Sequence, residues 1–188
     1  MDIEKHPFEP FIPDSPSILF MGTFPPQPKR WSMEFYYPNW TNDFWRIMGF
    51  IFYSDKNHFC DLQHKTYRLD DIKEFLSTHN IAMWDSAMEV VRLKDNASDK
   101  FLDIRKPIDI KGMLNTYPSL VKLVTAGEKA TVTISDLLGT TPPCMGGYTD
   151  FFFNGRRIRH YRMPSSSRAY PMSLDKKAAM YSLLFGKD

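Results

Sequence analysis

The sequence predicts an α/β protein of three layers, α/β/α, in which a short parallel four-stranded sheet lies between two layers of helices. Two observations carry this prediction: four short apolar runs, and helix-like segments that separate them. Near-continuous apolar runs are typical of strands covered on both faces, as in a parallel sheet. The alternation of such strands with helices indicates the layered α/β class.

The four predicted strands are residues 17–24, 81–85, 120–127 and 157–164. The last run, RIRHYRMP, differs from the others because charged and apolar residues alternate along it. Alternation indicates a strand with one face in solvent, so we expect an edge strand. His160 could be a catalytic base, but on such a strand we expect it to be a surface residue.

Five segments are predicted as helices: 43–53, 71–79, 110–117, 128–138 and 173–185. Ser173 has the side chain of a good N-cap for the last of them. No internal repeat, low-complexity tract or interdomain linker divides the chain. We therefore expect residues 1–188 to form a single domain, a length that allows a sizeable core.

Composition excludes several classes of protein. Lys and Arg number 24 against 22 Asp and Glu, so a basic surface has to come from local clustering, and residues 156–168 supply such a cluster. Cys60 and Cys144 lie far apart and cannot form a disulfide framework or a four-cysteine cluster, and we expect no metal or other cofactor. We expect no signal peptide and no membrane span. We expect a protein of the cytoplasm, associated with the chromosome.

Three predicted strands end in segments that could form a site. The stretch GTFPPQPKRW (22–31) follows the first strand, Asp85 ends the second, and PSSSRAYP (164–171) follows the fourth. In open α/β sheets, ligands bind at the carboxyl ends of the strands. We therefore expect these segments to converge on one rim.

Each candidate residue on this rim also has a structural interpretation. Tyr37 could be a platform on which a flat base stacks, or an ordinary core aromatic. Asn42 could orient a water and Asp43 could be a general base, or both could cap the helix that begins there. The serines and arginines of PSSSR could grip a phosphate, or the serine hydroxyls could cap local backbone groups in a turn.

Four segments, taken in order, resemble a known family. They are ILFMGTFPP (18–26), FYYPNWTNDFWRIMG (35–49), IAMWD (81–85) and MPSSSRAY (163–170). Together they resemble the motifs of the uracil-DNA glycosylase superfamily, and they are most similar to its mismatch-specific and hypoxanthine-DNA (deoxyinosine) branches. The resemblance spans nearly the whole chain. It implies a short parallel four-stranded sheet between helices, and cleavage of the bond between a flipped, deaminated base and its deoxyribose without a metal.

The resemblance also implies roles for individual residues. The implied base-binding residues are Gly22, Thr23, Phe24 and Tyr37. The implied catalytic residues are Asn42, with Asp43 or Asp85 in support. The implied DNA-binding residues are Arg162, Ser165, Ser166, Ser167 and Arg168. The implied partner is double-stranded DNA that contains a deaminated or mispaired base, bound by a monomer.

One departure from the family pattern sets the alternatives. Phe24 stands where the uracil and mismatch branches place a water-positioning Asp or Asn. The favoured function is a monofunctional DNA glycosylase acting on uracil or hypoxanthine. The alternative is a non-catalytic DNA-binding member of the same fold. A third reading, an unrelated α/β hydrolase, lacks the GxSxG sequence that such enzymes carry.

Overall fold

A computed structural model describes residues 2–94 and 98–186 and confirms the α/β class. The central sheet has the strand order β5-β2-β8-β10-β9. Its first four strands run parallel to one another, as predicted. The strands are β2 (Ile18–Gly22), β5 (Ile81–Asp85), β8 (Lys122–Ala126), β9 (Tyr148–Phe153) and β10 (Arg156–Met163).

The fifth strand corrects the prediction for residues 157–164. Strand β9 pairs antiparallel with β10, so β9 is the edge strand and β10 lies inside the sheet. The two strands are joined by Asn154 and Gly155, which both have positive φ, at 49° and 75°. An Asn-Gly pair in this backbone region is the usual two-residue hairpin turn.

His160 is consequently a buried residue of β10, and the expectation of a surface position was wrong. Its Nε2 lies 2.9 Å from the hydroxyl of Thr125 on β8. Burial lowers the pKa of His160 to about 4, because the charged ring has no water around it. The histidine is therefore a neutral member of a core hydrogen-bond network.

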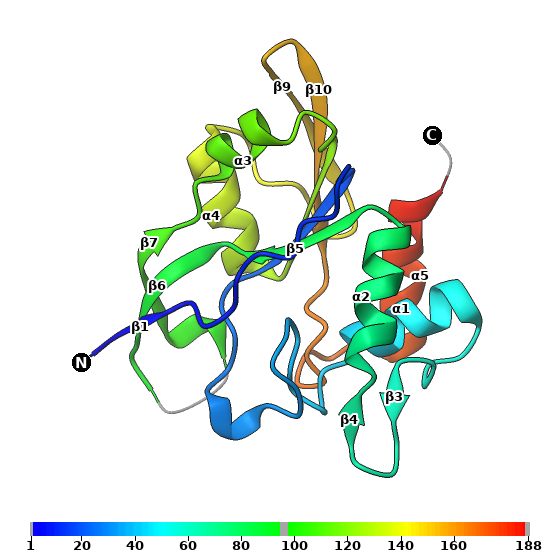
Figure 1. The fold of residues 1–188 in the computed structure, drawn as a ribbon. Coiled ribbons are helices and arrows are strands. Elements are labelled where there is room, and N and C mark those ends of the chain that lie inside the picture. Colours follow the sequence, from blue (N-terminus) through cyan, green and yellow to red (C-terminus); the bar gives the residue numbers. More distant parts are fainter. Residues whose placement is uncertain (1, 95–97, 187–188) are drawn as a thin grey trace.

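Two layers of helices cover the sheet, one on each face (Figure 1). One face packs on α1 (Phe44–Tyr53), α2 (Leu69–Thr78) and α5 (Leu174–Ser182). The other face packs on α3 (Ile110–Thr116) and α4 (Glu128–Leu138). These bounds match the predicted helices closely, and the Ser173 hydroxyl accepts the Lys176 amide as the predicted cap of α5. A short 3-10 helix, η3 (Leu183–Phe185), follows α5.

A second, smaller sheet was not predicted. It consists of the antiparallel strands β1 (Ile3–Lys5), β6 (Ala87–Arg92) and β7 (Leu102–Pro107), in the order β1-β6-β7. The remaining elements are the hairpin β3 (Cys60–Asp61) and β4 (Thr66–Tyr67), and the 3-10 helices η1 (Pro28–Arg30) and η2 (Asp99–Phe101). Because β1 pairs with β6, which directly follows β5, residues 3–5 lie near the carboxyl end of β5 (Figure 1).

Candidate active site

Strands β2 and β5 bring three of the predicted residues together at their carboxyl ends. The backbone amide of Gly22 donates to Asp85 Oδ1 at 3.0 Å. A Cβ atom on Gly22 would stand 3.0 Å from that oxygen and 3.6 Å from the hydroxyl oxygen of Tyr37. Position 22 therefore admits only glycine without displacing Asp85, and the three residues form the centre of the site.

His6 completes this centre from the N-terminal segment. Its Nε2 lies 2.9 Å from Asp85 Oδ2, and the two side chains are only 4% and 9% exposed. Since a carboxylate accepts, Nε2 carries the proton. The His6 Nδ1 lies 3.2 Å from the amide nitrogen of Phe8 and 2.9 Å from its carbonyl oxygen. The neutral ring can accept from that amide and the charged ring can donate to that carbonyl, so both protonation states find a partner.

Tyr37 has an unusual backbone and an unpaired hydroxyl. Its φ of 53° lies in the left-handed region, which costs a residue with a side chain free energy. Its ring stacks on Phe44, with centroids 3.9 Å apart and planes 7° apart. The hydroxyl oxygen is buried and has no hydrogen-bond partner in the described part of the chain. Burial raises the pKa of Tyr37 well above its ordinary value, so the hydroxyl stays protonated.

Thr23 and Phe24, the two residues that follow β2, have side chains that point in different directions. Thr23 is buried and donates its hydroxyl to Asp99 Oδ2 at 2.7 Å. The ring of Phe24 packs with Val90 and Leu102 of the small sheet. Its edge also faces the ring of His6, with centroids 5.4 Å apart. Phe24 is thus a core residue of the small sheet.

Asn42 lies at the start of α1 and has one end engaged. Its Oδ1 accepts the amide of Phe44, the first residue of α1, at 2.9 Å and so occupies one free amide at the helix start, whereas the N-cap residue Asp43 makes no side-chain cap hydrogen bond. Its amide nitrogen makes no hydrogen bond to a described residue. The buried Arg46 fixes the backbone that leads into α1, because its Nη1 donates to the carbonyls of Trp40 and Asn42 at 3.0 and 3.2 Å.

Asp43 is the centre of an ion-pair cluster with the buried Lys177 and the half-exposed Arg168, which we call the Asp43 cluster. Its Oδ1 accepts from Arg168 Nε at 2.9 Å and its Oδ2 from Lys177 Nζ at 3.2 Å. The Lys177 side chain is 0% exposed and also donates to the carbonyl of Ser167. With both oxygens bound by cations, Asp43 ties α1, α5 and the final loop together.

Residues 164–168, which we call the serine loop, pack against the start of α1. The hydroxyls of this loop accept hydrogen bonds from its own backbone and that of the next residue. Ser166 is buried, and its carbonyl accepts the amide of Asp43 at 2.9 Å. Ser167 forms an isolated β-bridge with Asn42. The hydroxyl of Ser165 accepts the amide of Ser167, and the hydroxyl of Ser167 accepts the amide of Ala169. These are the turn contacts that the sequence offered as the alternative to phosphate binding.

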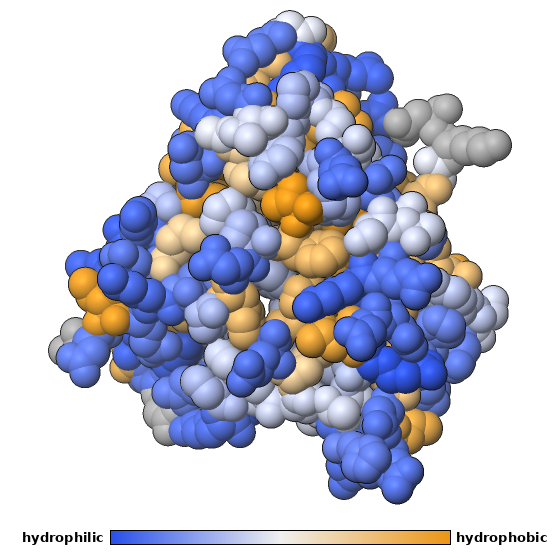
Figure 2. Space-filling model, viewed as in Figure 1, coloured by the Kyte–Doolittle hydropathy of each residue, from blue (hydrophilic) through white to orange (hydrophobic). Residues whose placement is uncertain are grey.

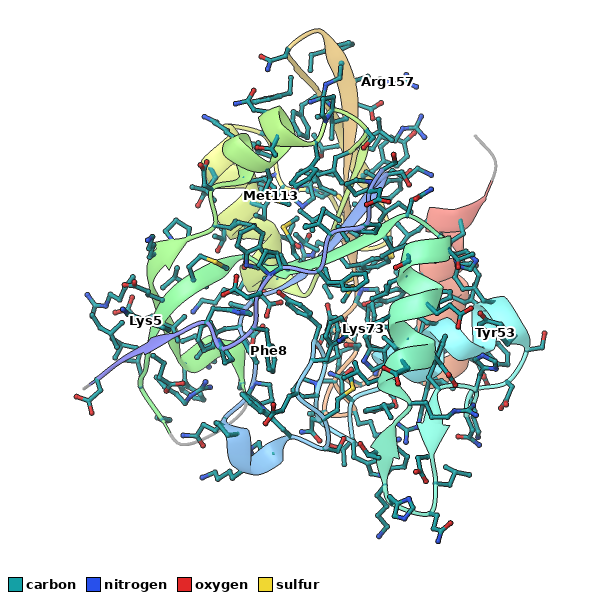
Figure 3. The ribbon with its side chains drawn as sticks, viewed as in Figure 1. Lys5, Phe8, Tyr53, Lys73, Met113 and Arg157 are labelled. Atoms are coloured by element: carbon teal, nitrogen blue, oxygen red, sulfur yellow. The ribbon has the colours of Figure 1, made fainter. Side chains whose placement is uncertain are left out.

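The arginines of residues 156–168 do not form one patch. Arg157 lies near the tip of the β9–β10 hairpin (Figure 3), roughly 23 Å along the strand from Pro164 at 3.3 Å per residue. Arg159 pairs with Asp150 at 3.2 Å. Arg162, at the carboxyl end of β10, has a buried Nε without a hydrogen-bond partner among the described residues. Of this basic run, Arg162 lies near the serine loop and the half-exposed Arg168 lies in it.

An open cavity of about 510 Å³ lies beside the site. Its lining includes Lys5, Pro7, Phe24 and Trp31. His6, between two of these lining residues, bonds Asp85, so the N-terminal segment forms the wall between the cavity and that carboxylate. Figure 2 shows hydrophobic residues gathered around a hollow near the middle of this face, and Figure 3 places Lys5 and Phe8 on the segment that crosses it.

Comparison with solved structures identifies the fold. No protein-family model and no curated protein matches the sequence. The solution NMR structure of a "putative Uracil DNA glycosylase from Methanosarcina acetivorans" is similar over 98% of this chain and 100% of that chain, with a TM-score of 0.62 and 20% sequence identity. The chain has a uracil-DNA-glycosylase-like fold.

Sequence reasoning missed two residues of the uracil-DNA-glycosylase-like rim, His6 and Asp99. His6 is 79 residues from Asp85, and Asp99 is 76 residues from Thr23. Both reach the rim through the small sheet, since His6 follows β1 and Asp99 begins η2 between β6 and β7. The alternation of apolar and charged residues in LDIR (102–105) was an available signal for that sheet.

Within residues 2–94 and 98–186, no group of three or more His, Cys, Asp or Glu side chains is arranged to hold a metal ion. No helix there is long and apolar enough to cross a membrane.

Proposed function

We propose that the protein is a DNA glycosylase that hydrolyses the bond between deoxyribose and a deaminated base, uracil or hypoxanthine, flipped out of duplex DNA. The observation that carries this proposal is the meeting of the four motif segments on one rim. Gly22 bonds Asp85, and Asn42 pairs with Ser167, across large separations in sequence. The similarity over the whole chain to the structure from Methanosarcina acetivorans supports it. We expect the protein to act as a monomer.

Hydrolysis of the bond between base and sugar requires the enzyme to stabilise the charges that develop on these two groups. The sugar develops positive charge as the bond to the base breaks, and the base leaves as an anion. In the proposed reaction the Asp85 carboxylate stabilises the sugar, and the amide nitrogen of Asn42 donates to the departing base. The proton on His6 Nε2 keeps Asp85 oriented. Flipping costs a few kcal/mol, and least at a mispair, which favours damaged sites before any contact is made.

The DNA contacts proposed for the final loop come from its arginines and its exposed hydroxyls. The Arg168 side chain is 47% exposed while its Nε bonds Asp43, so the rest of its guanidinium can contact a backbone phosphate. Arg162 is partly exposed at the base of the same loop, and its charge is the second one proposed to face the backbone, although its Nε is buried. Ser165 and Ser167 are partly exposed and complete the proposed phosphate contact.

The experiment that tests this function measures base release directly. Protein in excess is incubated with duplexes that carry one uracil or hypoxanthine, or a T·G mispair, and abasic sites are cleaved with alkali. We expect release from uracil or hypoxanthine duplexes and none from an undamaged one. Asp85→Asn keeps the side-chain shape and removes the charge, and it should abolish most release. Asp103→Asn, in a half-exposed carboxylate paired with Arg105 on β7, is the matched control.

A second function, DNA binding without catalysis, is favoured by one observation. The acceptor oxygens of all three candidate catalytic residues are engaged within the protein. Asn42 bonds the Phe44 amide, both oxygens of Asp43 bond cations, and both oxygens of Asp85 bond Gly22 and His6. Duplex binding with no base release from any of the lesions would establish this function in place of the first.

A further inference from the structure

A carboxylate from outside the motifs reaches the place where Phe24 supplies no polar group. Asp99 begins η2, in the connection between β6 and β7. Its Oδ2 accepts the hydroxyl of Thr23 at 2.7 Å, and Thr23 directly precedes Phe24 in the first motif. The small sheet therefore delivers an acidic side chain to the loop in which the uracil and mismatch branches carry a water-positioning Asp or Asn.

The surroundings of Asp99 suit a proton acceptor. Its pKa lies above the ordinary value of an aspartate, chiefly because burial disfavours the charge, and the nearby Asp85 carboxylate adds to the effect. Two cations face it and lower the pKa, but both are committed elsewhere. Lys129 Nζ donates to the backbone carbonyls of Asp99 and Leu102. The guanidinium of Arg92 forms a two-point pair with Glu4, at 3.0 Å for each contact.

A second polar group at the same place has spare bonding capacity. The Tyr37 hydroxyl is buried without a partner in the described residues, and its pKa is raised in part by the charges of Asp85 and Asp99. The Asp99 Oδ1 makes no hydrogen bond to the same set of residues. A buried water is held by two to four polar partners, and each of these groups has a free position for one.

We propose that Asp99 is the general base that activates the attacking water in the glycosylase reaction, a role that rests on the function proposed above. The carbon–nitrogen bond at C1′ breaks and leaves its electron pair on the base. The water oxygen forms the new bond to C1′, and its proton passes to the Asp99 carboxylate. The base anion takes a proton from solvent, so that the products are the free base and an abasic site.

Asp99→Asn and Thr23→Val separate this role from a structural one. Asp99→Asn keeps an oxygen that accepts the Thr23 hydroxyl and removes the charge. Thr23→Val breaks the hydrogen bond and keeps the charge. A general base predicts a loss of about 10²–10⁴-fold in single-turnover base release for Asp99→Asn. It predicts a much smaller loss for Thr23→Val. If the Thr23–Asp99 hydrogen bond only holds the two segments together, Thr23→Val should lose more rate than Asp99→Asn. Asp103→Asn is again the control.

Two further readouts belong to the same experiment. Since burial penalises the ionised carboxylate, Asp99→Asn is expected to melt at the same temperature as wild type or higher. A general base works deprotonated, so the wild-type rate falls as the pH drops through the pKa of Asp99, and that limb disappears in Asp99→Asn. Tyr37, Asp85, Lys129 and Arg92 are the other titratable or charged groups near it, and they remain in the variant.

The outcomes distinguish the two proposals. Base release by wild type with an unchanged rate in Asp99→Asn overturns the role of Asp99 and leaves the glycosylase function standing. No release by wild type from any duplex overturns both. The expected result is a large loss of base-release rate in Asp99→Asn, with no fall in melting temperature and unchanged DNA affinity. The fall of the rate at low pH should also be absent in this variant.

Discussion

Replacing Asn42 with alanine and with aspartate tests the two ends of its side chain separately. The oxygen of Asn42 accepts the Phe44 amide at 2.9 Å, whereas its amide nitrogen makes no hydrogen bond to a described residue. Alanine removes both groups. Aspartate keeps an acceptor for the Phe44 amide and removes only the donor. If the donor contacts the departing base, both variants lose activity, and the alanine variant alone loses the cap.

The structure sets the expected magnitudes. Loss of an Asn cap costs about 1 kcal/mol, which lowers the melting temperature of a domain of this size by about 2–4 °C. A larger fall is not expected, because Arg46 and the Tyr67 hydroxyl bond the carbonyl oxygen of Asn42 independently of its side chain. Removal of one preorganised donor to a developing anion lowers the rate by about 10²–10³-fold.

The assay is single-turnover base release from the preferred duplex, with melting temperature and duplex affinity measured on the same preparations. We expect Asn42→Asp to melt with wild type and to release base at least about 10²-fold more slowly. Duplex affinity shows whether the new charge merely repels DNA. A wild-type rate in Asn42→Asp would refute the donor role and leave Asn42 as a helix cap only.

Four further predictions follow from the contacts described. Lys177→Met should lower the free energy of unfolding by about 3–5 kcal/mol in urea titrations, because it strips a buried cation from Asp43, and Asp43→Asn in the same chain should restore part of the loss. Arg162→Ala with Arg168→Ala should weaken binding to all duplexes alike and reduce the slope of log affinity against log salt by about 2 in titrations. Because the pKa of His160 is lowered to about 4, the unfolded chain binds this proton first, so the free energy of unfolding should fall as the pH drops from about 6.5 towards 4. Base release should be unchanged after treatment with a chelator.

Each of these has a contradicting result. An additive double variant would show that Lys177 and Asp43 do not interact. An unchanged salt slope would remove Arg162 and Arg168 from the DNA contact. The acid-dependent loss of stability should flatten in His160→Gln, and a full loss in that variant would assign it to other groups. Inhibition by the chelator, reversed by added metal, would contradict a metal-independent reaction.

The central sheet and its helices could be predicted because their signals are local. Buried parallel strands read as continuous apolar runs, and the helices carry the usual amphipathic spacing and, at Ser173, a cap. Strand β9 was missed because YTDFFF (148–153) shows neither a continuous apolar run nor an alternation of apolar and polar residues, and none of its residues is fully buried. The Asn154-Gly155 turn was a strong hairpin signal in the sequence, and it places β10 inside the sheet.

The site was only partly predictable, for a different reason. The motif segments supplied Gly22, Asp85 and the serine loop, because strand ends and loops stand out in the sequence. What each side chain binds depends on residues far along the chain. Neither the pairing of Asp85 with His6 nor that of Asp43 with Lys177 leaves any trace in the residues next to it.

The span of the Asp43 cluster in the sequence has a consequence during synthesis of the chain. Arg168 follows Asp43 by 125 residues and Lys177 follows it by 134. At a translation rate of about 5–20 residues per second, roughly 7–27 s separate the aspartate from its lysine. Until then α1 has neither the cation nor the packing of α5. A ribosome that stalls after the codon of Met163 but before that of Lys177 therefore holds a chain that has all five strands of the central sheet but cannot close the rim.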